Sequence, residues 1–326
     1  MPRILVFCSL LALAFSTPSA VWAKSAPYEM TAKKHSWFSF NRPAKKNPMD
    51  QLALARRLQA DGQLKKAGKA YRALTTTWPG SPEATLAQWG LAQTLDARGK
   101  LEDAFNEYNT LATKYTGNYP YDSIVQRQFE IANATMDKRK GALLIFGGFK
   151  APERAIPLFE KVIQNAPRAP FAAESQYLIG HAYELSEQLE LAVVAYMNAQ
   201  NRYPGTEWSE KAAFGRARCL IRLSEESPND EEALDQAWAA IIVYLNAYPN
   251  SEENNLAQAY RDSLLRRRAK ASYDKALFYD KVAKRPLAAV KSYENFVRQY
   301  PNSEWSALAR ARIKELTPLV EKLNEN

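Results

Sequence analysis

Apolar residues recur along this chain at a spacing that fits one face of a helix. Ala192, Tyr196, Ala199 and Pro204 are separated by steps of four, three and five residues. The first three lie on one helical face, and the proline ends the helix because it has no N–H group and disfavours the helical region for its predecessor. The pattern predicts a buried helix face followed directly by a turn.

The same spacing occurs at other places, which indicates an internal repeat. In one copy, Gly117 follows Thr116 and takes the place of the proline as helix breaker. The further copies are Ala67, Tyr71, Leu74, Pro79; Ala104, Tyr108, Leu111, Thr116; Ala155, Phe159, Val162, Pro167; Ala237, Ile241, Tyr244, Pro249; and Ala289, Tyr293, Phe296, Pro301.

The residues around each proline predict a joint between successive helices. Residues 203–208 read YPGTEW and residues 300–305 read YPNSEW. Thr206, Ser251 and Ser303 can cap the following helix, and a glutamate in its first turn suits the positive end of the helix dipole. We therefore expect a helix end, a tight turn and a helix start at each joint.

A partner helix precedes each patterned helix, most clearly in residues 172–188, AAESQYLIGHAYELSEQ. Gly180 would allow close approach of two helices, while Ile179 and Tyr183 fill the space beside Ala192. Over about 34 residues this pattern resembles the tetratricopeptide repeat. It predicts an all-α fold: a superhelical solenoid of about six helix-turn-helix units, with residues 304–323 as a C-terminal capping helix.

Three stretches depart from even spacing. Residues 141–151, GALLIFGGFKA, predict a flexible turn within the third unit because of Gly147 and Gly148. Residues 224–232 predict a polar loop within the fifth unit. The charged run at residues 261–270 predicts a long helix or a tight helix pair before the last copy.

The N-terminal residues are typical of an exported protein. Arg3 precedes an apolar run that ends at Phe15, and Val-Trp-Ala follows at residues 21–23. We interpret residues 1–23 as a signal peptide cleaved near Ala23, residues 24–48 as a basic aromatic arm and residues 49–323 as the solenoid. The arm interleaves lysines with Trp37, Phe38 and Phe40, which suits either an anionic membrane interface or an unstructured linker.

Charge and motifs argue against an enzyme. The formal net charge of +9 comes from basic residues that alternate with acidic ones, which favours solvated helix faces over a nucleic-acid partner. His35 and His181 are far apart, and no metal-ligand spacing, phosphate loop or Gly-x-Ser-x-Gly elbow occurs. Cys219 is expected to be a small buried residue. We expect no catalytic residue, metal, cofactor or small-molecule substrate.

Protein binding is the function that a solenoid most readily supports. The side chains on the first helix of each unit that face away from its partner helix would line a groove. An aromatic residue there can anchor a peptide, or it can simply fill a gap between repeats, as Trp89 and Tyr177 could. The predicted groove residues are Arg56, Trp89, Gln93, Asp96, Glu174, Tyr177, His181 and Glu184.

From about Ala151 onward the chain resembles the BamD-like family of outer-membrane assembly factors. The resemblance is carried by PERAIPLFEKVIQNAP, AAESQYLIGHAYE, AVVAYMNAQNRYPGTEW, YLNAYPNSEENNLAQAY and the stretch from KALFYDKVAKRPLAAVKSYENF to SALARARIKEL. It implies a periplasmic scaffold of outer-membrane β-barrel assembly, peripheral to the outer membrane. Its C-terminal repeats would dock on the barrel-forming subunit, and its N-terminal groove would take unfolded outer-membrane proteins.

One feature departs from that family, whose members are typically lipoproteins. The sequence has no cysteine at the predicted cleavage site, so we expect no lipid there. The arm, through a peripheral membrane contact, or a partner would then hold the protein at the membrane. The alternative is a soluble periplasmic adaptor of the tol-pal or peptidoglycan-coordination type, although no heptad segment precedes the repeats.

Overall fold

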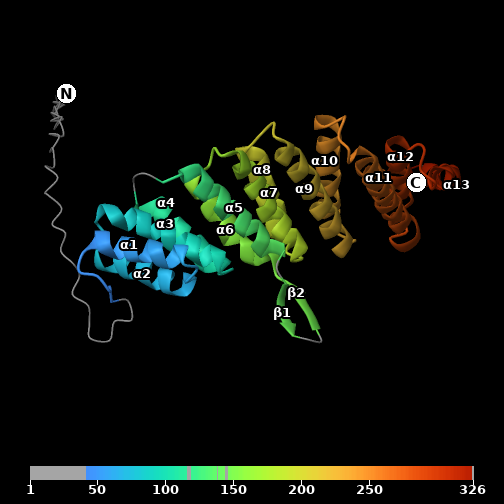
Figure 1. Ribbon diagram of the computed structural model, residues 1–326. Coiled ribbons are helices and arrows are strands. Elements are labelled where there is room, and N and C mark those ends of the chain that lie inside the picture. Colours follow the sequence, from blue (N-terminus) through green and yellow to red (C-terminus); the bar gives the residue numbers. More distant parts are fainter. Residues whose placement is uncertain (1–41, 116–118, 138, 144–145, 325–326) are drawn as a thin grey trace, which may run out of the picture.

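The computed structural model describes residues 42–115, 119–137, 139–143 and 146–324. In this part of the chain, helices form consecutive pairs that follow one another from α1 to the C-terminal helix (Figure 1). The pairs are α1 (Pro48–Ala60) with α2 (Leu64–Thr77), α3 (Pro82–Ala97) with α4 (Leu101–Lys114), α5 (Tyr121–Asp137) with α6 (Ile156–Asn165), α7 (Pro170–Leu185) with α8 (Leu189–Arg202), α9 (Glu207–Glu226) with α10 (Glu231–Ala247), and α11 (Asn254–Leu277) with α12 (Pro286–Gln299).

A last helix, α13 (Ser306–Asn324), packs on α12 and ends the stack. We call the first helix of each pair the A helix and the second the B helix. Over the residues that the structure describes, the predicted helical solenoid of about six units with a capping helix is confirmed. It is supplemented by one element that we did not predict, a strand pair in the third unit.

The repeated apolar pattern forms the core. Its first three residues lie in the B helix of every unit, or directly before it in the case of Ala155, and are at most 5% exposed. Tyr71, Tyr196 and Tyr293 are among the largest buried side chains. Each unit therefore buries one face of its B helix against its own A helix and the next one, as the spacing predicts.

Glycines make room for the buried tyrosines. A Cβ atom at Gly180 in α7 would lie 2.5 Å from a Tyr196 ring carbon, and one at Gly215 in α9 would lie 2.6 Å from the same ring. Real Cβ atoms do not approach so closely. Tyr196 is therefore held between two A helices, and the close approach predicted at Gly180 is confirmed.

Of the three residues predicted to cap a following helix, only Thr206 is an N-cap. Thr206 is the N-cap of α9, and its Oγ1 accepts a hydrogen bond from the backbone N–H of Ser209 at 3.2 Å. Ser251 and Ser303 instead accept from the backbone N–H two residues later, within the turn, and the helices begin at Asn254 and Ser306. A two-residue turn therefore separates each serine from the first residue of the helix that follows it.

The three irregular stretches also take defined forms. The flexible turn that we predicted at residues 141–151 is instead part of an antiparallel hairpin of β1 (Arg139–Leu143) and β2 (Phe146–Lys150), which extends away from the helices (Figure 1). Its chain then enters a short 3-10 helix at Pro152–Ala155 before α6. The fifth unit has its loop between Glu226 and Glu231, and the charged run lies in the single long helix α11.

At the N-terminus the description begins at Arg42, so the predicted signal peptide and most of the predicted arm lie outside the described residues. Asn47 caps α1 by accepting a hydrogen bond from the Asp50 backbone N–H at 2.8 Å. The side chain of Gln51 accepts from the backbone of Ala44 and Lys45, which fastens the preceding segment to α1. None of the described helices is long and apolar enough to cross a membrane.

Candidate protein-binding surfaces

A buried carboxylate joins the fourth unit to the fifth. Glu184, near the end of α7, is 7% exposed. Its carboxylate accepts a hydrogen bond from the Tyr196 hydroxyl in α8 at 2.6 Å, and from Nε and Nη2 of Arg218 in α9 at 2.6 and 2.8 Å. One carboxylate thus connects three helices.

The environment of Glu184 favours its ionised form. Burial alone would raise the pKa of this carboxyl, but His181, Arg218 and Tyr196 outweigh burial and lower the pKa to about 2. In return, burial and the neighbouring carboxylate raise the pKa of Tyr196. The group therefore holds a permanent ion pair at neutral pH.

The same arrangement joins the second unit to the third. Asp96 in α3 accepts from Nε and Nη2 of Arg127 in α5 at 2.7 and 2.8 Å, and from the Tyr108 hydroxyl in α4 at 3.4 Å. Arg127 also pairs with Glu130 one turn later. The tyrosine is again the middle residue of the repeated apolar pattern.

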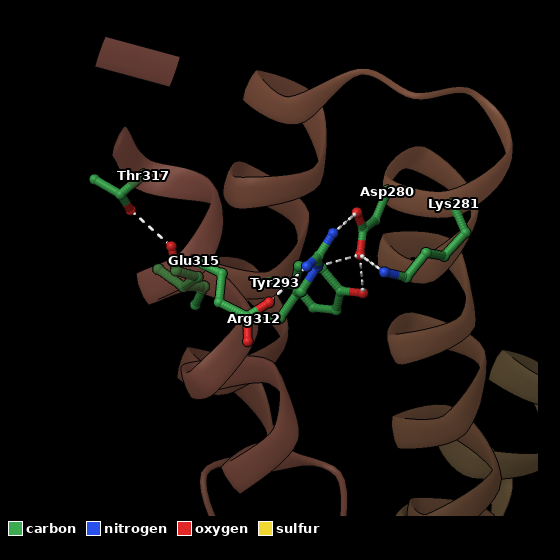
Figure 2. Close-up of polar contacts among 7 residues, drawn as sticks. Asp280, Lys281, Tyr293, Arg312, Glu315 and Thr317 are labelled. Atoms are coloured by element: carbon green, nitrogen blue, oxygen red, sulfur yellow. Dashed lines mark hydrogen bonds and ion pairs between the residues drawn. The ribbon is translucent and has the colours of Figure 1, made fainter. Parts of the chain in front are cut away.

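It occurs a third time under the capping helix, as Figure 2 shows. Asp280, which follows α11, is 9% exposed and accepts from Nε and Nη2 of Arg312 in α13 at 2.7 and 2.8 Å. The Tyr293 hydroxyl lies 3.3 Å from the same carboxylate, and Lys281 is 3.4 Å away. The hydrogen bonds from Arg312 lower the pKa of Asp280 despite its burial.

We call these three groups the carboxylate joints: Asp96–Tyr108–Arg127, Glu184–Tyr196–Arg218 and Asp280–Tyr293–Arg312. Two of the predicted groove residues, Asp96 and Glu184, belong to these joints. Their carboxylates are hydrogen-bonded to a tyrosine and an arginine of neighbouring helices, and a contact of either residue with a peptide stays a prediction. Their role in the structure is to connect units.

Three other predicted residues, Glu174, Tyr177 and His181, lie on α7, the A helix of the fourth unit, beside residues of α9 in the fifth unit. The ring of Tyr177 stacks on the His181 ring at 5.9 Å between centroids. It also contacts Trp208 of α9 at 5.4 Å, and the Lys211 ammonium lies 4.1 Å from the centre of the Trp208 ring. Glu174 belongs to the same surface: burial raises its pKa, as does nearby Glu207, while Lys211 opposes the shift.

We call Glu174, Tyr177, His181, Trp208 and Lys211 the aromatic surface. All are half-buried except Lys211, which is exposed. The rings are therefore fixed by packing and still reachable from solvent, and charges of both signs stand beside them. Such a surface can hold an apolar side chain of a peptide between aromatic faces and orient its polar groups.

The remaining predicted residues lie at the N-terminal end of the stack. Arg56 in α1 and Gln93 in α3 are exposed, while Trp89 is half-buried and packs against the N-terminal core. The A helices α1 and α3 are in contact, so these residues share one region. They belong to different units from the aromatic surface, and the predicted residues therefore fall into two groups.

Cavities lie elsewhere on the stack. One, of about 490 Å³, is formed by α6, α7 and α8 and is lined by Ile163, Ile179 and Tyr183, with exposed Leu191 and Val194 at its edge. Another, of about 570 Å³, lies between α11 and the turn before α13. Neither is lined by a predicted groove residue. The described residues also hold no cluster of histidine, cysteine and carboxylate side chains suited to a metal ion.

The solved structures that are similar to this chain include tetratricopeptide repeat proteins. MamA of Desulfovibrio magneticus RS-1 is 14% identical, with 63% of this chain and 97% of that chain covered and a TM-score of 0.29. A thermophilic repeat protein of Thermus thermophilus is 18% identical, with 67% and 99% covered and a TM-score of 0.30. A tetratricopeptide repeat protein of Parabacteroides merdae is 15% identical, with 83% and 98% covered and a TM-score of 0.29.

No curated protein matches the chain. A family model does: YfiO, described as an outer membrane lipoprotein, matches residues 173–322. The matched range begins within α7 and ends within α13, so it contains the aromatic surface and two of the carboxylate joints. Over residues 173–322 the chain is thus similar to the YfiO family, and the BamD-like resemblance that we recognised in the sequence is confirmed there.

Proposed function

We propose that this protein is a periplasmic scaffold of outer-membrane β-barrel assembly, peripheral to the outer membrane. The observation that carries the proposal is the match of residues 173–322 to a family described as an outer membrane lipoprotein. A repeat stack supports such a role, since its units contact mainly their neighbours and leave long surfaces for other proteins. The proposal includes no catalytic step.

The two groups of groove residues are the proposed binding sites. The group at Arg56, Trp89 and Gln93 would take segments of unfolded outer-membrane proteins. The aromatic surface around Tyr177 and Trp208 would hold a second peptide segment. The C-terminal units, from α11 to α13, would dock on the barrel-forming subunit.

Membrane attachment would not use a lipid on a cysteine behind the predicted cleavage site. The sequence has cysteines only at positions 8 and 219, and Cys219 is buried. We expect the mature protein to begin near Lys24 and to carry no acyl chain. The intact mass of protein isolated from its native envelope tests this, because an added acyl mass would contradict it.

Affinity purification from cross-linked envelopes tests the function itself. Co-isolation of a large β-barrel protein together with unfolded outer-membrane proteins is the expected result. Recovery of peptidoglycan-associated proteins without a barrel protein would favour the alternative, a soluble periplasmic adaptor of the tol-pal type.

A further inference from the structure

The turn between α11 and α12 exposes large apolar side chains. A π-helical turn at Phe278–Val282 continues α11, and Lys284 then adopts a positive φ of 51° before α12 begins at Pro286. Phe278, Val282 and Leu287 are 52%, 68% and 47% exposed. The burial of such side chains is favourable, so their exposure within one short turn suggests that another surface covers them.

Unpaired positive charge surrounds these residues. Lys275, Lys284, Arg285 and Lys291 are all exposed, and their side chains form no hydrogen bond or ion pair within the described part of the chain. The nearby carboxylates are mostly neutralised: Asp274 pairs with Lys270, and Asp280 pairs with Arg312 and Lys281. Glu294 in α12 and Glu315 in α13 are also near the turn, and Glu315 pairs with Arg312. Glu231 and Asp235 of α10 line a pocket with Lys275, and Asp235 pairs with Arg268.

The turn is held firmly although its side chains are exposed. Asp280 lies inside it and is fixed by two hydrogen bonds from Arg312 in α13 (Figure 2). The backbone N–H of Ala283 donates to Phe278, and that of Arg285 donates to Tyr279, both at 2.9 Å. The apolar and basic side chains are therefore presented on a preformed structure.

We propose that this turn, residues 275–291, binds the anionic headgroups of a phospholipid membrane. Basic side chains near such a surface are attracted by its negative potential, while adjacent apolar side chains enter the boundary between headgroups and acyl chains. The three exposed apolar residues are contributed by a single helix–helix turn. A stable protein interface usually buries about 800 Å² on each partner, so a protein that docks on α11 to α13 must contact more than this turn. A lipid surface needs only a few such residues.

This proposal does not depend on the function in β-barrel assembly, because purified protein and vesicles suffice to test it. The chain from Lys24 onward would be sedimented with vesicles of phosphatidylcholine alone, or of phosphatidylcholine mixed with phosphatidylglycerol. We expect binding only to the mixed vesicles, and weaker binding as salt is added. Absence of binding to the mixed vesicles at low salt overturns the proposal and makes the turn a candidate protein contact instead.

Two variants locate the binding. Lys284→Gln with Arg285→Gln and Lys291→Gln should reduce partitioning roughly 100-fold, because each basic residue near an anionic surface contributes about a fivefold factor. Phe278→Ser with Val282→Ser should reduce it at least about tenfold without any change in charge, since less apolar surface then enters the interface. The altered residues are exposed, and circular dichroism verifies that both variants are folded.

Control variants distinguish membrane binding by this turn from binding that depends on the overall positive charge or on the N-terminal arm. Lys65→Gln with Lys69→Gln and Lys100→Gln removes the same charge from exposed positions in the first two units. Retained binding by this control supports the proposal, and an equal loss contradicts it. A second control tests the N-terminal arm and combines Lys33→Gln, Lys34→Gln, Lys45→Gln and Lys46→Gln. If only this arm variant loses binding to the vesicles, the turn is not the membrane site.

Discussion

Arg218 and Glu184 are 34 residues apart in sequence, yet two charge-assisted hydrogen bonds of 2.6 and 2.8 Å connect them. The arginine comes from the A helix of one unit and the carboxylate from the A helix of the unit before. The Tyr196 hydroxyl donates to the same carboxylate, so the B helix α8, which lies between the two A helices, is bonded to this ion pair as well.

Removal of the arginine should therefore destabilise the stack. Arg218→Ala leaves the buried carboxylate of Glu184 without its cation, and we expect the free energy of unfolding to fall by roughly 3 kcal/mol. Urea unfolding followed by circular dichroism measures the change. Arg222→Ala is the matched control, because its partner Glu187 is exposed and such pairs contribute less than about 1 kcal/mol. If both substitutions lowered the free energy of unfolding equally, the buried ion pair would contribute no more to stability than an exposed one.

The same joint predicts a dependence of stability on pH. The pKa of Glu184 is lowered from 4.5 to about 2 in the folded protein. Its ionised form thus contributes stability that is fully present above about pH 4.5 and is lost as the pH falls towards 2. Glu184→Gln should be less stable than the wild type near neutral pH, and the difference should narrow between about pH 5 and about pH 3.

Urea unfolding of both proteins across that pH range gives the measurement. Glu187→Gln serves as the control, since its carboxylate is exposed and its removal should cause only a small loss of stability. A difference for Glu184→Gln that stays constant down to about pH 3 would mean that the carboxylate is not stabilised by its neighbours.

Glycine positions give a prediction about packing. Gly180→Ala should destabilise the protein by roughly 2 kcal/mol or more, because the new methyl group would overlap the buried Tyr196 ring. Gly68→Ala is the control: the nearest side-chain atom would lie at an ordinary 3.5 Å, and alanine favours a helix interior. That control should be neutral or more stable by up to about 1 kcal/mol, as thermal melts would show. A stable Gly180→Ala protein would mean that the two helices are farther apart than described.

Cys219 should be chemically inert in the folded protein. Burial raises the pKa of its thiol to about 12, with the nearby Glu184 carboxylate as a further cause, so the reactive thiolate is scarce near pH 8. Labelling of the chain from Lys24 with a thiol reagent should be slow in buffer and complete in urea. Rapid labelling without denaturant would contradict the burial of this side chain.

Peptide binding should depend on tryptophans of the A helices. Trp89→Ala should weaken capture of an unfolded barrel peptide by about 1 to 3 kcal/mol if the N-terminal region is its site. Trp208→Ala should have an effect of that size if the aromatic surface is used. Trp238→Ala is the control, since this half-buried tryptophan lies on the B helix α10 beside Arg268. Fluorescence anisotropy with a labelled peptide measures all three, and loss of binding in the control alone would place the site on the B helices.

The fold could be predicted largely because its signal is local and repeated. The spacing of Ala192, Tyr196 and Ala199 specifies a helix face, and Pro204 specifies its end. Both inferences need only the immediate neighbours in sequence. The strand pair at residues 139–150 could not be predicted in the same way, because a short apolar run that contains glycines fits a turn, a strand or a helix end.

The site was less predictable because burial of a carboxylate depends on distant residues. Asp96 and Glu184 occur at spacings that suit an exposed helix face, while the arginines that neutralise them are 31 and 34 residues later. A signal was present, since each joint has its tyrosine 12 or 13 residues after the carboxylate. Trp208 was overlooked for another reason: it belongs to the YPGTEW stretch, which we interpreted only as a turn and a helix start.

The hairpin of β1 and β2 has a consequence for how the length of this protein can change. Antiparallel pairing places Arg139 opposite Lys150, so the chain returns close to the point at which it left α5. The insertion therefore adds residues without adding rise or rotation to the units on either side. Insertions and deletions at this position would leave the distance between the N-terminal region and the C-terminal units unchanged. Related proteins can therefore differ in length at the hairpin and still keep the same spacing between their binding surfaces.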